Sequence, residues 1–512
     1  IFLYCLPFCL LFASCSDLLD EESYSETGKG NYLNNAKEAE TVLQGVYKNL
    51  ANEYTYSYHL SLLFTISTDI AQCEGSSTTS FREIPTNSHN ASTSQISRTW
   101  QQLYSAIYDA NDFIETVSDR MDGWGSSDRE LAAIYLGEAR ALRALFYFEL
   151  VRWYGNVVLM TSTADSRKKD EDYEQSAAED VYAYIEEDLK YAAEVLPWAV
   201  DDTKRTSNAY RFSKGAALGL LAKVYCTWAG YPVRDESKWA EAEKVARRVV
   251  ESGKHRLISD YETVWKNTCN GIWDAGESLI EVSFYSPTGL DSDNTAGRIG
   301  KWNGVSATTI DGERGRNAAN WKVVYTFTRD WEAQNDPRMK LSIADYKYDH
   351  TLGSGPSTYF STISSANPSE DQKNRQRQLF TPGKWDTEKY VETSNYIVNN
   401  DKSNVNWYIL RYSDVLLLFA EALNESGGSI VDAVDAVNAV RRRGFGDTKH
   451  DLSYGLSRED LREAIRKERA YELCFEGHRK QDLIRWGIYY DRVMETAQEL
   501  VNWYSNANYA VA

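Results

Sequence analysis

Apolar residues recur at intervals of three and four along most of the chain, which is the spacing of one face of an α-helix. Trp100, Tyr104, Ile107 and Asn111 follow one another at steps of four, three and four residues, so they share one helix face. The same spacing runs through residues 139–150. The pattern therefore predicts a mostly helical protein.

Some of these helices are expected to form pairs around short turns. Small residues alternate with Tyr, Leu and Trp in the pairs, as they do in tetratricopeptide-like hairpins that stack on one another. The scaffold is therefore expected to consist of stacked helix pairs. The pairs are 217–228 with 239–250, around Gly230-Tyr231-Pro232, and 412–423 with 430–440, around Gly427-Gly428.

Two regions lack this spacing. Residues 69–97 are rich in Ser, Thr and Asn, and residues 267–382 mix Gly, Asn, Asp and Ser with many aromatics. Long insertions on a compact scaffold usually carry function. The alternative for each aromatic is that it packs its loop onto the helices. We place the ligand site in these regions, with stacking rings from the second and polar groups from the first: Trp273, Tyr285, Trp302 and Trp321, with Arg82, Asn87 and His89.

Charge and composition narrow the class of ligand. The 512 residues include 75 Asp and Glu and 56 Lys and Arg, so the formal net charge is −19. This sign disfavours a nucleic acid or an anionic lipid surface as the partner. Aromatic residues make up 13% of the chain, more than a disordered acidic protein carries. A folded, acidic, aromatic-rich protein suits a neutral ligand.

The common catalytic and metal-binding motifs are missing from the sequence. Its six histidines are dispersed, and GxSxG, GxxxxGK[ST] and a strand-linked GxGxxG do not occur. The cysteines beyond the N-terminal segment show no CxxC spacing. We therefore expect no metal, no cofactor and no catalytic centre; a pair of glycosidase carboxylates is the alternative. These cysteines are Cys73, Cys226, Cys269 and Cys474.

The N-terminal segment is typical of a secretory leader. Residues 1–13 are uncharged and fewer than the about 20 that a spanning helix needs, and we expect the sequence to begin inside its leader. Phe12-Ala13-Ser14-Cys15 resembles a bacterial lipobox, although an ordinary leader with a chance cysteine is the alternative. We expect residues 1–14 to be a partial signal peptide, with Cys15 lipidated. Residues 15–30 would then be a tether whose acidic start resembles the export signal of Bacteroidota surface lipoproteins.

The last third of the chain contains a dense set of motifs: Arg411 to Glu425 (RYSDVLLLFAEALNE), Ala436 to Arg443 (AVNAVRRR), Glu468-Arg469, Glu472-Leu473, Phe475 to Arg479 (FEGHR) and Asp482 to Gly487 (DLIRWG). Together they resemble the SusD/RagB family of outer-membrane nutrient-binding lipoproteins. Segments 100–111, 138–155, 212–225 and 336–338 extend the resemblance over nearly the whole mature chain.

Two glutamates of these motifs resemble an acid/base pair. Glu468 and Glu472 lie four residues apart, with Arg469 and Arg479 nearby. Apolar residues flank them, and a buried charge is tolerated only when it is paired. We therefore expect ion pairs between helices here, and no catalysis.

The resemblance implies a SusD-like helical fold in one body over residues 31–512. Its scaffold would lie mainly in 31–260 and 405–490, with a loop-rich ligand-binding region at about 265–385. It further implies a protein held by lipid on the cell outer membrane, which captures an oligosaccharide and delivers it to a SusC-like TonB-dependent transporter. RagB-like peptide binding is the alternative within the family, and a surface glycosidase is a third hypothesis.

Overall fold

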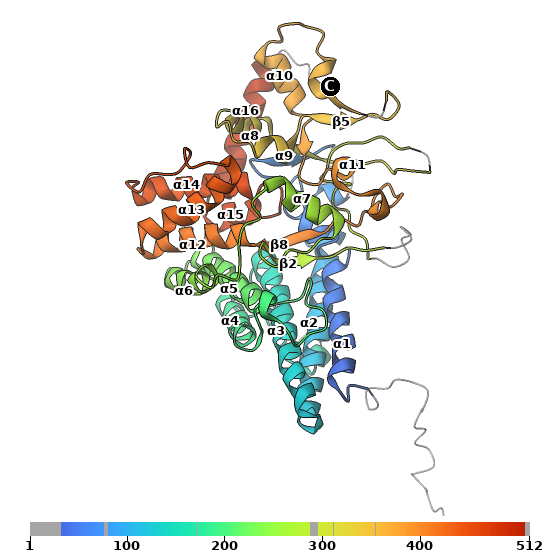
Figure 1. The fold of residues 1–512 in the computed structure, drawn as a ribbon, viewed down its shortest axis with the longest axis vertical. Coiled ribbons are helices and arrows are strands. Elements are labelled where there is room, and N and C mark those ends of the chain that lie inside the picture. Colours follow the sequence, from blue (N-terminus) through green and yellow to red (C-terminus); the bar gives the residue numbers. More distant parts are fainter. Residues whose placement is uncertain are drawn as a thin grey trace, which may run out of the picture.

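The computed structural model describes residues 32–75, 80–169, 172–286, 295–310, 312–353 and 355–506; the predicted leader, Cys15 and the tether lie outside them. Helices dominate (Figure 1), which confirms the mostly helical prediction. The helices are α1 (Ala36–Lys48), α2 (Ser94–Arg120), α3 (Ser126–Tyr154), α4 (Ala178–Val195), α5 (Lys214–Ala229), α6 (Lys238–Val250), α7 (Tyr261–Asn270), α8 (Tyr325–Glu332), α9 (Met339–Ser342), α10 (Glu370–Arg377), α11 (Thr387–Tyr390), α12 (Tyr412–Ser426), α13 (Ile430–Phe445), α14 (Arg458–Glu472), α15 (Arg479–Arg485) and α16 (Tyr489–Asn506).

The strands of the described residues form four short antiparallel ribbons of two strands each, which pair as β1–β3, β2–β8, β4–β7 and β5–β6. Every residue of β2 and β8 is buried, so this ribbon belongs to the core. The strands are β1 (Ala71–Cys73), β2 (Ser278–Val282), β3 (Trp321–Val323), β4 (Ile343–Ala344), β5 (Tyr346–Tyr348), β6 (Pro356–Thr358), β7 (Thr381–Pro382) and β8 (Trp407–Arg411).

The predicted apolar face of α2 packs into the scaffold. Ile107 and Asn111 are buried, and Asn111 accepts a hydrogen bond of 2.7 Å from Arg143 of α3. Arg143 in turn donates two bonds of 2.8 Å to Asp188 of α4. Because a buried charge needs a partner, this chain of contacts fixes α2, α3 and α4 relative to one another.

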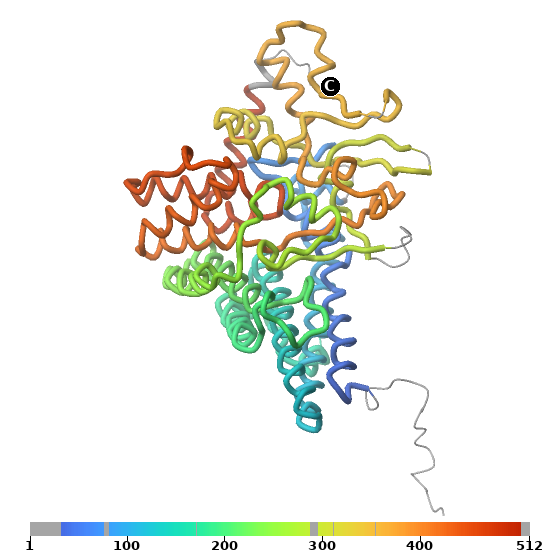
Figure 2. Tube along the Cα trace, viewed as in Figure 1, coloured from blue at the N-terminus to red at the C-terminus, as the bar shows by residue number. Residues whose placement is uncertain are grey.

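The two predicted helix pairs form as expected. A turn at residues 230–232 separates α5 from α6, and Gly427 ends α12 with a left-handed φ of 81° that suits glycine. Contacts of α6 with both α5 and α12 join the two pairs. The helices α4 to α6 and α12 to α14 therefore stack side by side, and the traces in Figures 1 and 2 show them on the left of the molecule.

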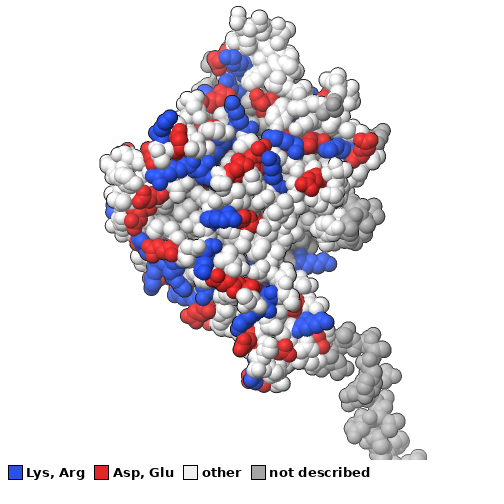
Figure 3. All heavy atoms as spheres, in the orientation of Figure 1, with Lys and Arg blue, Asp and Glu red and all other residues white. Residues whose placement is uncertain are grey.

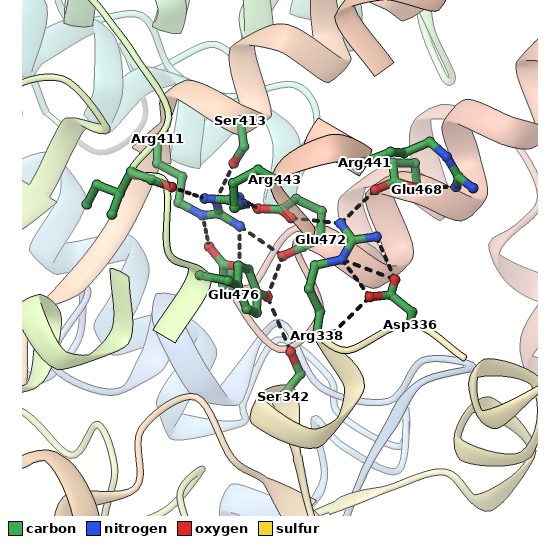
Figure 4. Close-up of polar contacts among 12 residues, drawn as sticks. Asp336, Arg338, Ser342, Arg411, Ser413, Arg441, Arg443, Glu468, Glu472 and Glu476 are labelled. Atoms are coloured by element: carbon green, nitrogen blue, oxygen red, sulfur yellow. Dashed lines mark hydrogen bonds and ion pairs between the residues drawn. The ribbon is translucent and has the colours of Figure 1, made fainter. Parts of the chain in front are cut away.

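Glu468 and Glu472 of the C-terminal motifs lie in a buried ion-pair network (Figure 4). Glu468 pairs with Arg338 at 2.6 Å and with Arg441 at 2.9 Å. Glu472 contacts Arg338 at 2.9 Å and Arg411 at 2.6 Å, and also pairs with Arg443. The prediction of ion pairs between elements is confirmed, and the network joins α14 to α13, to β8 and to the segment before α9.

The long region at 267–382 contains more regular structure than its composition predicts. Four short helices, α8 to α11, and strands β3 to β7 lie in or beside it. Each is eight residues or shorter, too short to display helical periodicity clearly. None of the helices in the described residues is long and apolar enough to span a membrane.

Candidate functional site

The two irregular regions of the sequence meet in space. Strand β1, at the start of the first region, pairs with β3 of the second, so that Cys73 lies opposite Trp321. The ring of Phe81 meets the ring of Trp302 edge-on, with 5.7 Å between their centroids. The regions that the sequence assigned to ligand binding therefore share one surface.

A strip of aromatic and cationic side chains forms where residues 295–302 run beside residues 53–58. We call Tyr58, Phe81, Arg298 and Trp302 the aromatic strip. The Arg298 N–H donates to the carbonyl of Ser57 at 3.0 Å. Its guanidinium lies 4.7 Å from the centre of the Tyr58 ring and 5.3 Å from that of Trp302. These cation–π contacts hold half-buried Trp302 against buried Tyr58.

A cleft of about 410 Å³ lies between α1, the loop at 207–211 and the end of β2. We call it the Tyr285 cleft, because the Tyr285 side chain at its edge is 64% exposed. Tyr210 also lines it, and the ring of Trp273 lies 6.3 Å from that of Tyr210. The backbone N–H of Tyr285 donates to Thr295, which leads into the strip. Thr295 lines the cleft and precedes Arg298 of the strip by three residues, so the two features are linked along the chain.

Glu281 supplies a buried carboxyl group to the lining of the Tyr285 cleft. It accepts hydrogen bonds from the amide of Asn406 at 2.8 Å and from the hydroxyl of Ser278 at 2.7 Å. Burial raises the pKa of the Glu281 carboxyl to about 7, and the two hydrogen bonds only partly offset this. Near neutral pH this group can therefore be either a hydrogen-bond donor or an acceptor.

The predicted site residues divide into three groups. Tyr285 lines the cleft, Trp273 supports it through Tyr210, and Trp302 lies in the strip. Trp321 is 4% exposed in β3 and packs in the core, so the prediction that it stacks on a ligand is wrong. Val323 of the same strand and Val324, which follows the strand, are buried with it.

The polar residues predicted from the first region lie farther from the Tyr285 cleft. Arg82 stacks over Phe81 at 4.8 Å and bonds the carbonyl of Glu74, so it extends the aromatic strip. Arg82 and Asn87 also line a separate cleft of about 260 Å³ beside α16. His89 is exposed and lines neither cleft.

Sequence reasoning missed Tyr58, Tyr210 and Arg298. A signal for Tyr58 was present, because Tyr54, Tyr56 and Tyr58 alternate in a segment with weak helical spacing. Tyr210 and Arg298 carried no such signal, since each is placed by contacts with distant parts of the chain. Within the described residues no group of three or more His, Cys, Asp or Glu side chains is arranged to hold a metal ion.

Fold and site together define a class of protein: a scaffold of stacked helix pairs with aromatic clefts on its loops. A family model described as "SusD family" matches residues 291–511, and a second, described as "Starch-binding associating with outer membrane", matches residues 17–226. The crystal structure of a SusD homolog from Bacteroides thetaiotaomicron VPI-5482 is similar to this chain at 55% identity. The match covers 94% of this chain and 92% of the other, with a TM-score of 0.88. The chain therefore belongs to the SusD family.

More distant relatives agree with this assignment. SusD-like protein P2 of Formosa agariphila is 26% identical over 93% of this chain and 88% of its own length. Surface glycan-binding protein A from Bacteroides thetaiotaomicron, solved in complex with laminarihexaose, is 19% identical, with a TM-score of 0.67. That match covers 89% of this chain and 91% of the other, so it demonstrates the shared fold.

Proposed function

We propose that this chain is a cell-surface lipoprotein that binds an oligosaccharide and delivers it to a SusC-like TonB-dependent transporter. Membership of the SusD family supports the proposal, as do relatives whose names describe binding to glycans, among them a laminarin-binding SusD-like protein and a laminarihexaose complex. The observation that carries it is the exposed Tyr285 ring at a cleft that a second tyrosine, Tyr210, also lines.

The chemistry of this surface suits a sugar chain. The C–H faces of sugar rings stack on Tyr and Trp, which offer flat apolar area at small entropic cost. Tyr285 and Trp302 would supply these faces along the surface. The guanidinium of Arg298 and the carboxyl of Glu281 would form hydrogen bonds with the hydroxyl groups. A run of several sugars could then contact the cleft and the strip together.

Binding without catalysis is the function that we propose for this surface. A glycosidase would place two carboxyl groups about 5 to 9 Å apart across a sugar bond. Glu40 and Glu281 both line the cleft, but Glu40 is paired with Arg211 and Glu281 is buried. Release of reducing sugar from a bound glycan would identify a glycosidase instead.

Two measurements test the proposal. The first is calorimetric titration of the full chain with laminarihexaose, and the second is binding of the chain to a glycan array that presents other oligosaccharides. Tyr285→Ala should weaken binding of the best glycan about 30-fold, the effect of losing an interface hot spot of about 2 kcal/mol. The matched control is Tyr454→Ala, since Tyr454 is 52% exposed on the loop between α13 and α14. It should bind as wild type does.

Two outcomes would contradict this assignment. Equal glycan affinity of Tyr285→Ala, Trp302→Ala and wild type would place the sugar elsewhere. Binding of mixed peptides, with no glycan bound on the array, would favour RagB-like use of the same scaffold.

A further inference from the structure

A second pocket lies away from the Tyr285 cleft, among elements of the stacked helix pairs. It has a volume of about 370 Å³ and is enclosed by the turn between α5 and α6, by α12 and α14, and by the end of α15. Three aromatic side chains line it, those of Tyr231, Trp239 and Trp486. We call it the Trp486 pocket. Its volume is within the range of about 300 to 1,000 Å³ that small-molecule sites occupy.

The turn before α6 is docked onto the end of α15 in a way that fixes one wall of this pocket. The N–H of Tyr231 donates to the carbonyl of Arg485 at 2.7 Å. A Cβ at Gly230 would lie 2.4 Å from that carbonyl, so only glycine permits the approach. A Cβ at Gly487 would lie 3.1 Å from the Tyr231 ring. The ring therefore rests closely on the backbone beside Trp486, and it remains 51% exposed.

The carboxylates in the lining are already neutralised. Arg485 holds Glu421 with two bonds, of 2.6 and 2.7 Å. Arg462 holds Glu425 in the same forked geometry, at 2.7 and 2.8 Å. Each glutamate is therefore paired through both carboxylate oxygens, and Arg485 also contacts Asp482 at 2.9 Å.

Two further arginines give the Trp486 pocket a surplus of positive charge. Arg234 approaches only Glu236 among the described carboxylates, at 3.5 Å, and both side chains are largely exposed. Arg466 pairs with Glu463, whose side chain is 60% exposed one turn earlier on α14. Pairs of this kind are weak and easily exchanged for a better anion. Figure 3 shows basic and acidic side chains interspersed over the face of the molecule that it draws, although the net charge is −19.

The guanidinium groups also fix the indole ring. Arg466 and Arg485 lie 5.1 and 5.0 Å from the centre of Trp486, and the indole N–H donates to Glu421 at 2.7 Å. Arg479 also lies over this ring, at 5.8 Å, so cations fix Trp486 in the pocket wall, and the exposed ring of Tyr231 is the one available to receive the apolar face of a ligand.

We propose that the Trp486 pocket binds a uronic acid, a sugar that combines an apolar C–H face with a carboxylate. Tyr231 would contact the ring of the sugar, and Arg234 and Arg466 would bind the carboxylate. This site is independent of the Tyr285 cleft and of the glycan bound there. It would give the protein a second, charge-selective contact with an acidic polysaccharide.

Calorimetric titration of the full chain with glucuronic acid, glucose and acetate tests this site. Glucuronic acid should show saturable binding. Glucose lacks the carboxylate and acetate lacks the sugar ring, so neither of these should bind. Arg234→Gln and Arg466→Gln should each weaken glucuronic acid binding about tenfold, the loss of one charged hydrogen bond, and the double variant should abolish it.

Matched controls separate this site from the rest of the protein. Arg248→Gln changes an exposed arginine of α6 that does not line the pocket, and Tyr285→Ala changes the other cleft. Both should bind glucuronic acid as wild type does. Wild-type affinity in the folded Arg234→Gln/Arg466→Gln variant would overturn the proposal. Equal binding of acetate and glucuronic acid would overturn the assignment to a sugar, and absence of glucuronic acid binding to wild type would overturn it altogether.

Discussion

Glu281 lines the Tyr285 cleft as a buried acid whose hydrogen bonds come from neutral groups, the amide of Asn406 and the hydroxyl of Ser278. An ionised carboxylate in such surroundings is poorly solvated. Burial therefore raises the pKa of Glu281 to about 7, from 4.5 in the unfolded chain. The folded state binds this proton more tightly than the unfolded state does. The contribution of Glu281 to the free energy of unfolding is therefore largest below pH 4.5 and is lost as the pH rises towards 7.

Glu281→Gln should remove this pH dependence, because the amide keeps the size of the protonated acid and can satisfy both neighbours. At pH 8 the variant should be about 3 kcal/mol more stable than wild type, and at pH 4 the two should be equal. Urea unfolding at a series of pH values measures the difference between the two proteins. The comparison with wild type is needed because burial lowers the pKa of His59 and His478 to about 3. These two histidines lower the stability as the pH falls, whereas Glu281 lowers it as the pH rises.

The control for this experiment is Glu459→Gln, an exposed glutamate of α14. Its stability difference from wild type should stay small and constant with pH. If the stability difference between Glu281→Gln and wild type is also constant between pH 4 and 8, the carboxyl of Glu281 is ionised in the folded protein and its high pKa is refuted.

At the same scale, single aromatics show what sequence can predict of a site. The sequence predicts large rings in polar, non-helical segments as ligand contacts; Tyr285 lies at the cleft and Trp302 is half-buried, and ligand contact by either stays a prediction. Trp321 is buried, because a three-residue strand pairs it with Cys73, about 250 residues earlier in the chain. No local pattern encodes that pairing, so exposed and buried rings cannot be separated from sequence alone.

At the scale of elements, the buried ion-pair network holds α14 against the strand and loop that carry the family motifs. Glu472 is central to it, since Arg338, Arg411 and Arg443 all contact its carboxylate. Burial opposes ionisation of Glu472, but these three cations hold its pKa well below its usual range. The carboxylate is therefore charged at every physiological pH.

Glu472→Gln should lower the free energy of unfolding by about 3 to 5 kcal/mol, because it leaves three buried guanidinium groups with one partner fewer. Chemical denaturation followed by circular dichroism measures this loss. The control is Glu495→Gln, which breaks an exposed pair with Arg492 on α16 and should change stability by less than about 0.5 kcal/mol. Equal stability of the two variants would show that the network does not hold α14.

A helix or strand can be predicted from the sequence only where it is long enough to show its own spacing of apolar residues. Helices of 13 residues or more, such as α2, α5 and α12, display several turns of apolar spacing. The four-residue helices α9 and α11 display about one turn each. The paired strands add contacts between distant residues, which periodicity does not report. The scaffold was therefore readable from the sequence, whereas the meeting of α1, the loop at 207–211 and the end of β2 around the cleft was not.

At the scale of the whole molecule, we predict that a lipid on Cys15 holds the protein at the outer membrane. The lipobox-like residues 12–15 motivate the prediction, together with the match to a family described as associating with the outer membrane. Two or more acyl chains anchor a protein stably, whereas one does so marginally. Cys15→Ala should therefore move the protein from the membrane to the soluble fraction. A variant that stays with membranes and still incorporates labelled palmitate would refute the anchor.

The proposed delivery of glycan to a transporter requires a lasting contact between two proteins. A permanent partner should bury more than about 2,000 Å² in total, enough to survive mild detergent. Affinity purification of the tagged chain from native outer membranes should therefore recover a large TonB-dependent barrel protein in a fixed ratio. The Tyr285→Ala variant is the control, since it changes the ligand site and should recover the same partner. Recovery of the chain alone, under conditions that keep other outer-membrane complexes intact, would remove the transporter from the proposed function.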